Sequence, residues 1–292
     1  MAKKTYIGVN GVAKNVKNVY IGINGVAKKV KKIYIGVNGV AKECYSSAVL
    51  PTIVSWSSGS DAEIVAMVQA ADNGVINLSD YWSVNDERQM VLSSISATGS
   101  WEAHASQTVT FVLMDTNKYT LTTATTSGRT TCSFVVGMKN SLAETGKTTA
   151  SAWNNSGRRG WLNSLFLNAI PSTIVSIFKQ FRTPSINSYR GSTIIYTDDY
   201  FALWAEKEVT GARTYSNSNE ANALSAITYY TTSSNRIKKN GGNDSTQSTG
   251  NWWWLRSLSY NSSSKICSII TNGQSGEYEV TYSGGISPFG CI

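Results

Sequence analysis

The first 45 residues repeat one pattern of apolar and polar positions with a period of 14 residues. The chain reads YIGVNGVAKNVKNV from Tyr6, YIGINGVAKKVKKI from Tyr20 and YIGVNGVAKECY from Tyr34. In each copy an Asn-Gly pair separates two β-prone runs, such as residues 19–23 and 26–30, and Asn-Gly favours a tight hairpin turn because both residues tolerate positive φ. The pattern predicts three copies of one β-hairpin, arranged as a meander or as a stack.

Two amphipathic helices are predicted in the remainder of the chain. Ser60 and Glu63 have the spacing of a capping box, and the run that follows is closed by Asn73-Gly74 after about 12 residues. Its apolar face carries Ile64, Val65, Val68 and Ala71. A second helix is expected from about residue 159 to residue 170, with Pro171 as its stop. The apolar residues at helical spacing there are Trp161, Leu162, Leu165 and Phe166.

Most other apolar segments have the short length of strands. Strands are predicted at residues 108–114, 132–136, 193–196, 266–270 and 278–282. Between them lie long polar tracts, of which residues 214–222 and 233–250 are the most extended. Two helices, short antiparallel strands and long loops predict an α+β domain over residues 46–292, preceded by a small β-hairpin module over residues 1–45.

Charge changes this picture more than overall composition does. The formal net charge of +8 lies entirely in residues 1–45, which hold nine Lys and one Glu, while residues 46–292 hold 17 basic and 17 acidic side chains. A neutral domain behind a basic arm indicates attachment more than nucleic-acid binding. For the arm we consider a homo-oligomeric stalk, an adaptor to another structural protein, a nucleic-acid patch, or a solvated lysine-rich sheet, and favour the first two.

The composition also restricts where the protein works. The chain is 41% hydrophobic, which is too apolar for disorder, and Ser, Thr and Asn together occupy 93 of 292 positions. No apolar run approaches the roughly 20 residues that cross a bilayer, and the repeat stands where a secretory signal would. We therefore expect synthesis in a cytoplasm and no membrane insertion.

Four short elements carry a resemblance to a known family. They are Asp80-Tyr81-Trp82-Ser83-Val84 with Asp86 and Arg88, Glu102-Ala103-His104, Gly160-Trp161-Leu162-Asn163, and Trp252-Trp253-Trp254-Leu255-Arg256-Ser257. This combination resembles a domain family of unknown function that is common in gut bacteria and their phages and is similar to C-type lectin folds. The resemblance spans about residues 46–292. Asn85 departs from it, since Gly is expected there, and residues 287–290 differ from the usual Gly-Val-Arg-Pro ending.

The resemblance implies a function in adhesion. Related C-type-lectin-like domains serve as phage tail adhesins, and some are variable proteins diversified by a reverse-transcriptase system. It implies a virion protein, in the tail or on the surface, that binds a bacterial surface receptor of protein or glycan. Residues 1–45 would contact other virion or tail proteins, in a homo-oligomer such as a trimer. The alternative is a structural virion protein, a baseplate or capsid decoration without receptor binding.

The C-terminal segment supplies the candidate ligand-binding residues. Consecutive tryptophans in a strand alternate between its faces, so Trp252 and Trp254 share one face. The neighbouring tracts are rich in Tyr, Asn and Ser, which give large contact area and adaptable hydrogen bonds. The alternative is that the tryptophans belong to the core. The predicted site comprises Asn243, Asp244, Asn251, Trp252, Trp254, Tyr260, Asn261, Ser262, Ser263, Ser264, Tyr278 and Tyr282.

Only weak signals point to enzyme chemistry, a cofactor or a metal. His104 is the one histidine and shares strand parity with Glu102, but no GxSxG element accompanies it. The pair Asp198-Asp199 lacks a calcium-loop spacing and is interpreted as a strand-end turn. Four cysteines without a CxxC pair argue against a zinc site, and Cys267 and Cys291 are interpreted as buried free thiols, with a contact between the two as the alternative. The sequence therefore predicts a binding protein without cofactor or metal.

Overall fold

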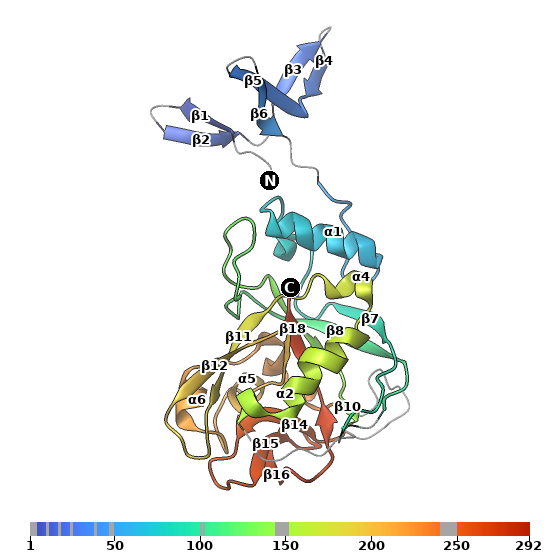
Figure 1. Cartoon of the computed structure of the whole chain (residues 1–292), viewed down its shortest axis with the longest axis vertical. Helices are drawn as coiled ribbons and strands as arrows, with labels where there is room; N and C mark the ends of the chain where they lie inside the picture. Colours follow the sequence, from blue (N-terminus) through green and yellow to red (C-terminus); the bar gives the residue numbers. More distant parts are fainter. Residues whose placement is uncertain are drawn as a thin grey trace.

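A computed structural model gives the arrangement of the elements (Figure 1). It describes residues 5–9, 12–16, 19–23, 26–37, 40–46, 50–99, 101, 103–143, 152–239 and 250–292. The fold is mixed α+β, with several sheets and few helices. In the described residues, no helix has the length and apolar character needed to span a membrane.

Three β-hairpins form the N-terminal repeats, as predicted. The strands are β1 (Thr5–Val9) with β2 (Val12–Val16), β3 (Tyr20–Ile23) with β4 (Val26–Lys29), and β5 (Lys32–Val37) with β6 (Val40–Ser46). Each pair is antiparallel and forms its own two-stranded sheet, so these strands do not pair as a meander. The Asn-Gly residues of the three turns lie outside the described residues.

Both predicted helices are present. Helix α1 (Asp61–Asp72) begins at the expected capping box, in which the Glu63 N–H donates to Ser60 Oγ and the Ser60 N–H donates to the Glu63 carboxylate. The second helical segment runs through α2 (Gly157–Trp161), a π-helical turn η3 (Leu162–Phe166) and α3 (Leu167–Ala169), and ends before Pro171.

Several short helices were not predicted, because one turn has too little apolar periodicity to be recognised. They are α4 (Ser172–Val175), α5 (Glu206–Thr210), α6 (Ser218–Asn222), and the 3₁₀ turns η1 (Leu78–Asp80), η2 (Trp153–Asn155), η4 (Thr228–Thr231) and η5 (Ser233–Arg236).

In the described residues from Leu50 onward, the strands form two five-stranded sheets and one separate hairpin. The first sheet has the order β13 (Phe201–Ala202), β18 (Phe289–Cys291), β9 (Phe134–Met138), β8 (Gln107–Thr116), β7 (Glu87–Leu92). The second has the order β10 (Leu142–Ala143), β17 (Gly285–Ile286), β14 (Trp253–Leu258), β15 (Lys265–Ile269), β16 (Ser275–Glu279). The hairpin joins β11 (Phe181–Ile186) to β12 (Ile194–Asp199).

Four of the five predicted strands overlap an observed strand closely, and the fifth extends past the end of its strand. Residues 108–114 lie within β8, and residues 266–270 match β15 except at the last position. Residues 132–136 and 193–196 overlap β9 and β12. The strand at 278–282 is wrong beyond Glu279, because the chain turns there and the Tyr282 N–H donates to the Glu279 carbonyl.

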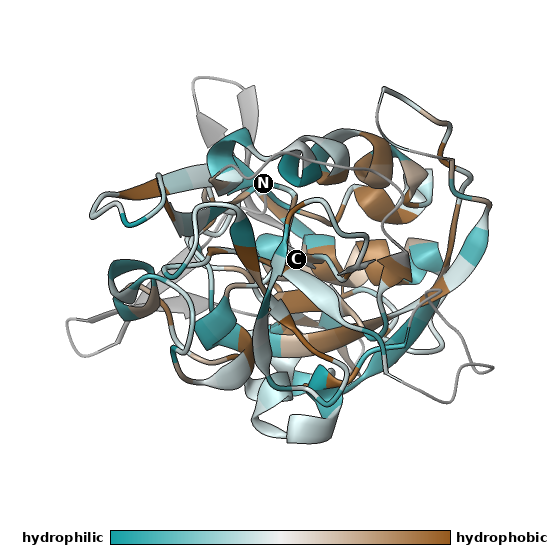
Figure 2. Cartoon of the chain, turned by 90° about the horizontal axis from the view of Figure 1, so that it is seen from below, coloured by the Kyte–Doolittle hydropathy of each residue, from teal (hydrophilic) through white to brown (hydrophobic). Residues whose placement is uncertain are grey.

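The two positions that differ from the expected pattern are accommodated in the backbone. Asn85 adopts φ of 81° and its N–H donates to the Leu113 carbonyl at 2.8 Å, so the turn is kept by a residue that tolerates the left-handed region. At the other departure, the Met138 N–H donates to the Pro288 carbonyl, and β18 still pairs with β9. Figure 2 shows the hydrophobic residues concentrated in the central strands and helices, with hydrophilic residues prevailing in the peripheral loops.

Candidate functional site

The tryptophan strand β14 is part of the core. Trp253 and Trp254 are fully buried, and every residue of β14 is buried. The Trp253 Nε1–H donates to the Arg236 carbonyl at 3.0 Å, while the Arg158 guanidinium lies 4.2 Å from the centre of the Trp254 ring. Trp254 therefore cannot contribute to an exposed platform, and the alternative interpretation as core holds for both side chains.

The arginine of the same strand forms a buried ion pair. Both terminal nitrogens of Arg256 donate to the Glu208 carboxylate, at 2.7 and 2.8 Å, and neither side chain is exposed. The Tyr119 hydroxyl donates to the same carboxylate at 2.6 Å. Burial alone would lower the pKa of Arg256, but the charge of Glu208 raises it, so the guanidinium stays ionised. This pair fixes β14 against helix α5.

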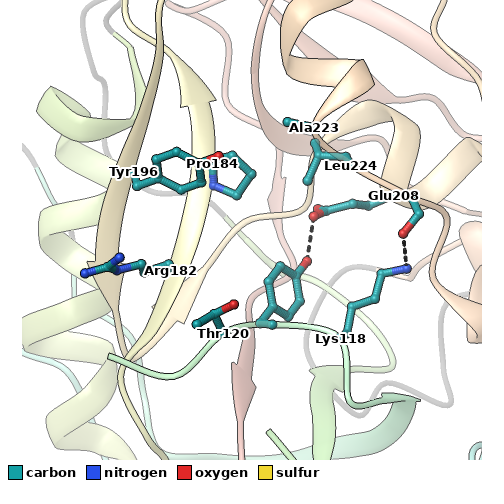
Figure 3. A pocket seen from close by; sticks show the side chains of 10 residues that line it. Lys118, Thr120, Arg182, Pro184, Tyr196, Glu208, Ala223 and Leu224 are labelled. Atoms are coloured by element: carbon teal, nitrogen blue, oxygen red, sulfur yellow. Dashed lines mark hydrogen bonds between the residues drawn. The ribbon is translucent and has the colours of Figure 1, made fainter. Parts of the chain in front are cut away.

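A cavity of about 300 Å³ opens beside this ion pair (Figure 3). Lys118, which lines it, is already engaged, since its Nζ donates to Ser225 Oγ at 2.5 Å and to the Ala226 carbonyl at 2.7 Å. The Glu208 carboxylate binds Arg256 and Tyr119, so it is not free to act as a general base. The cavity therefore offers little reactive chemistry.

Of the predicted tryptophans, Trp252 is the one near the surface. Its ring lies 4.7 Å from the Trp254 ring, which confirms that alternate tryptophans share a face. It also lies 4.3 Å from the Tyr278 ring, and Tyr278 in turn lies 6.2 Å from Tyr282. Trp252 is half-buried and Tyr282 is 55% exposed. These three aromatic side chains form one small surface cluster.

The predicted Tyr/Asn/Ser tract forms the turn between β14 and β15. We call residues 259–264 the Tyr260 turn; Tyr260 is 40% exposed, and Asn261, Ser263 and Ser264 are exposed as well. Glu277 of β16 stabilises the turn, since its carboxylate accepts hydrogen bonds from Ser259 Oγ and, at 3.4 Å, from Asn261 Nδ2. It is also paired with Lys265. The turn is therefore rigidly supported yet open to solvent.

Two other loops, distant in the chain, meet the Tyr260 turn. The Arg190 Nε donates to the Tyr260 carbonyl at 3.2 Å, and the Tyr189 hydroxyl donates to the Asn261 carbonyl at 3.3 Å. From the loop that precedes α6, the Tyr215 carbonyl accepts the Tyr260 N–H at 2.7 Å. The guanidinium groups of Arg190 and Arg213 lie 5.4 and 5.8 Å from the centre of the Tyr260 ring.

Sequence reasoning missed these arginines. Tyr189-Arg190-Gly191 lies at the turn between β11 and β12. The arginine next to a turn glycine was the feature of the sequence that could have indicated an exposed basic side chain there. Its position next to Tyr260 follows from tertiary packing across a separation of 70 residues, which periodicity does not reveal.

The predicted residues of the Tyr260 turn and the aromatic cluster lie on opposite sides of β16. Glu277 faces the Tyr260 turn, so Tyr278 faces the opposite side of the strand, toward Trp252. The two groups still adjoin at one edge, where the Val280 N–H donates to the Ser264 carbonyl at 3.2 Å. The Asn251 N–H donates to the Lys238 carbonyl at 2.7 Å, in a bridge between these two residues. Asn243 and Asp244 lie outside the described residues.

The weaker candidates for chemistry have structural surroundings. The Asp199 carboxylate is fully buried and accepts hydrogen bonds from Trp153 Nε1 at 2.9 Å and Arg159 Nε at 2.6 Å, among others. The ring of His104 packs 5.6 Å from that of Trp161, while Glu102 lies outside the described residues. No group of three or more His, Cys, Asp or Glu that could hold a metal occurs in the described ranges.

The described cysteines are buried, and Cys132 contacts Cys291. The Cys291 thiol interacts with Cys132, a hydrogen bond that lowers the pKa of Cys132, whereas burial raises the pKa of Cys291. Cys267 instead donates to the Leu258 carbonyl at 3.6 Å. All three are buried free thiols, which confirms that interpretation of Cys267 and Cys291.

Comparison with known proteins gives one match. The model of a family described as a domain of unknown function, DUF6273, matches residues 107–292. No curated protein and no solved structure matches the chain.

Proposed function

The chain belongs to the DUF6273 family, and we propose that this member is an adhesin of a phage tail or other virion surface that binds a bacterial surface receptor. The large domain would be a C-type-lectin-like scaffold that presents the Tyr260 turn. The observation that carries the proposal is the meeting of three loops, distant in sequence, at an exposed turn of Tyr, Asn and Ser. Such side chains combine contact area with adaptable hydrogen bonding.

The support beneath the turn favours binding over a solvated connection. Ser259 is buried and its Oγ accepts the N–H groups of Asn261 and Ser262, at 3.0 and 3.3 Å. Glu277 accepts the hydroxyl of the same serine. A turn of fixed shape loses little conformational entropy when it meets a ligand, so its binding is stronger than that of a loose loop.

The N-terminal hairpins would attach the protein to the particle. In the β3–β4 hairpin, the register pairs Ile23 with Val26 and Ile21 with Lys28, which places Ile21, Ile23 and Val26 on one face. All three are at least 41% exposed. A two-stranded sheet with an exposed apolar face is marginal by itself, so it supports contact with other virion proteins or with copies of this chain, such as a trimer.

Binding to intact bacteria tests the adhesin proposal. Labelled full-length protein is incubated with a panel of gut bacterial strains, and the variant Tyr260→Ala is compared with the matched control Tyr196→Ala. Tyr196 is 63% exposed and lies on β12, so its loss alters a different surface. We expect binding to at least one strain, weakened tenfold or more by Tyr260→Ala and unchanged by Tyr196→Ala. Binding to no strain, or equal loss in both variants, would favour a purely structural virion protein.

Population sequences give a second test. The tract from Tyr260 to Ser264 contains only residues that mutagenesis at AAY codons produces, while Trp252, Lys265 and Glu277 lie outside that alphabet. If this gene is a target of a diversifying reverse transcriptase, substitutions should concentrate in residues 260–264 and spare Glu277. Uniform variation over the large domain would contradict that part of the proposal.

A further inference from the structure

Two arginines beside Tyr260 have unused hydrogen-bond donors. Arg190 donates through Nε to the Tyr260 carbonyl, and Arg213 donates through Nε to the Ser216 carbonyl at 2.8 Å. Both arginines are exposed. In the described part of the chain, neither forms an ion pair with a carboxylate. The Nε contacts hold the guanidinium groups in place and leave their terminal nitrogens to solvent.

Two carboxylates near these loops, those of Glu206 and Glu277, are already engaged. Glu206 is fully buried and accepts the N–H groups of Thr214, Tyr215 and Ser216. Glu277 is bound by Ser259, Asn261 and Lys265. Since residues 46–292 carry equal numbers of basic and acidic side chains, the unpaired arginines are a local feature and not a consequence of general basicity.

The backbone at Arg190 is held in an uncommon conformation. Its φ is 53°, a left-handed value that costs a residue with a side chain about 1–2 kcal/mol. The loop is fixed by Asn217, whose Nδ2 donates to the Gly191 carbonyl at 2.9 Å. Strained positions that the surroundings maintain are concentrated at functional sites, so this outlier supports a role for the Arg190 side chain.

We propose that Arg190 and Arg213, whose guanidinium groups lie 5.4 and 5.8 Å from the centre of the Tyr260 ring, bind an anionic group, a carboxylate or a phosphate, carried by a surface saccharide. This inference rests on the proposed adhesin function and names the ligand of the same site. Arginine presents paired donors that match the oxygens of both anions. The Tyr260 ring provides an apolar surface for the adjoining sugar, and the hydroxyls of the turn provide further hydrogen-bond partners.

Three immobilised polymers distinguish the sources of the anion: a uronic-acid polymer, a phosphate-bearing polysaccharide and neutral dextran. Binding of the full chain is measured at about 50 and 200 mM salt, for the wild type, Arg213→Gln, the double variant Arg190→Gln/Arg213→Gln and the control Arg182→Gln. Arg182 is an exposed arginine of β11 and is 3.5 Å from Asp198. We expect one anionic polymer to bind, with affinity reduced tenfold or more in the double variant, severalfold in Arg213→Gln and unchanged in the control.

The outcomes separate this inference from the adhesin proposal. Binding to dextran alone, binding to no polymer, or equal affinity in the double variant and the control would overturn the anion site. If bacterial binding still depends on Tyr260 but is insensitive to both arginines, the adhesin proposal stands and the anion site fails. If an anionic polymer binds through the arginines but no bacterium is bound, the anion site stands and the adhesin proposal fails.

Discussion

Replacement of Glu208 by Gln tests whether the buried ion pair holds the tryptophan strand in place. The substitution preserves the shape of the side chain but removes the negative charge opposite Arg256. The amide group would also direct N–H donors toward a guanidinium that has only donors. Arg256 would then remain buried and charged, with the carbonyls of Leu203 and Pro184 as its remaining partners.

The expected loss of stability follows from the burial of the pair. Removing one partner of a buried ion pair costs about 3–5 kcal/mol, because the other charge stays in an environment of low polarity. For a domain of this size each kcal/mol lowers the Tm by about 2–4 °C, so Glu208→Gln should lower it by roughly 6–20 °C. The exposed pair of Glu87 and Lys139, in which both side chains are 44% exposed, provides the matched control. Glu87→Gln should cost about 0–1 kcal/mol.

Urea unfolding, monitored by tryptophan fluorescence in the same buffer, gives the free energy of unfolding of Glu208→Gln and of Glu87→Gln. The reasoning would be refuted if Glu208→Gln lost no more stability than Glu87→Gln. A double-mutant cycle with Arg256→Met then separates the unpaired charge from altered packing. The double variant should lose less than the sum of its single variants, with a coupling energy of about 0.5–3 kcal/mol. Simple additivity would mean that the two groups do not interact.

Three further changes probe other buried groups. Burial raises the pKa of Glu220 to about 7, so the folded state retains a proton that the unfolded chain releases near pH 4.3, and stability falls as pH rises between these values. Glu220→Gln should reduce this loss between pH 5 and pH 8 by about 2–3 kcal/mol in thermal unfolding. Asp199→Asn should lower the free energy of unfolding, measured in urea, by about 3 kcal/mol. The Asp199 carboxylate accepts hydrogen bonds from several donors, among them Trp153 Nε1, and an amide with one oxygen cannot accept them all. Gly284→Ala places a Cβ against the Trp252 ring. It should shift the fluorescence of Trp252 and lower the free energy of unfolding by about 1–3 kcal/mol.

The features that sequence patterns predicted well are those set by local interactions. Helix α1 was predicted from its capping box and apolar periodicity, and the repeats were predicted as hairpins from Asn-Gly and strand length. The alternation of Trp252 and Trp254 was also correct, since it depends only on strand geometry. By contrast, the burial of Trp254 depends on Arg158 from another segment of the chain, which covers its ring.

The composition of the candidate site was harder to predict for the same reason. The Tyr260 turn was recognised by its residues, but Arg190 and Arg213 come from other loops and carry no motif. Tyr278 and Tyr282 were expected in one strand, yet the hydrogen bond from Val280 to the Ser264 carbonyl is the last in the register of β15 and β16, and the chain then turns. Alternating apolar residues are compatible with either conformation, so tertiary contacts decide between them.

The hydrogen bonds of the Tyr260 turn separate the residues that shape it from those that it displays. Ser259 is buried, and its hydroxyl binds both the backbone of the turn and the Glu277 carboxylate. Ser263 and Ser264, in contrast, are exposed. Substitution of exposed residues away from such interactions usually changes stability by less than about 0.5 kcal/mol. The turn can therefore change its displayed side chains while the buried strand β14 and the Ser259–Glu277 contact preserve its backbone, which is the property that a variable ligand-binding surface requires.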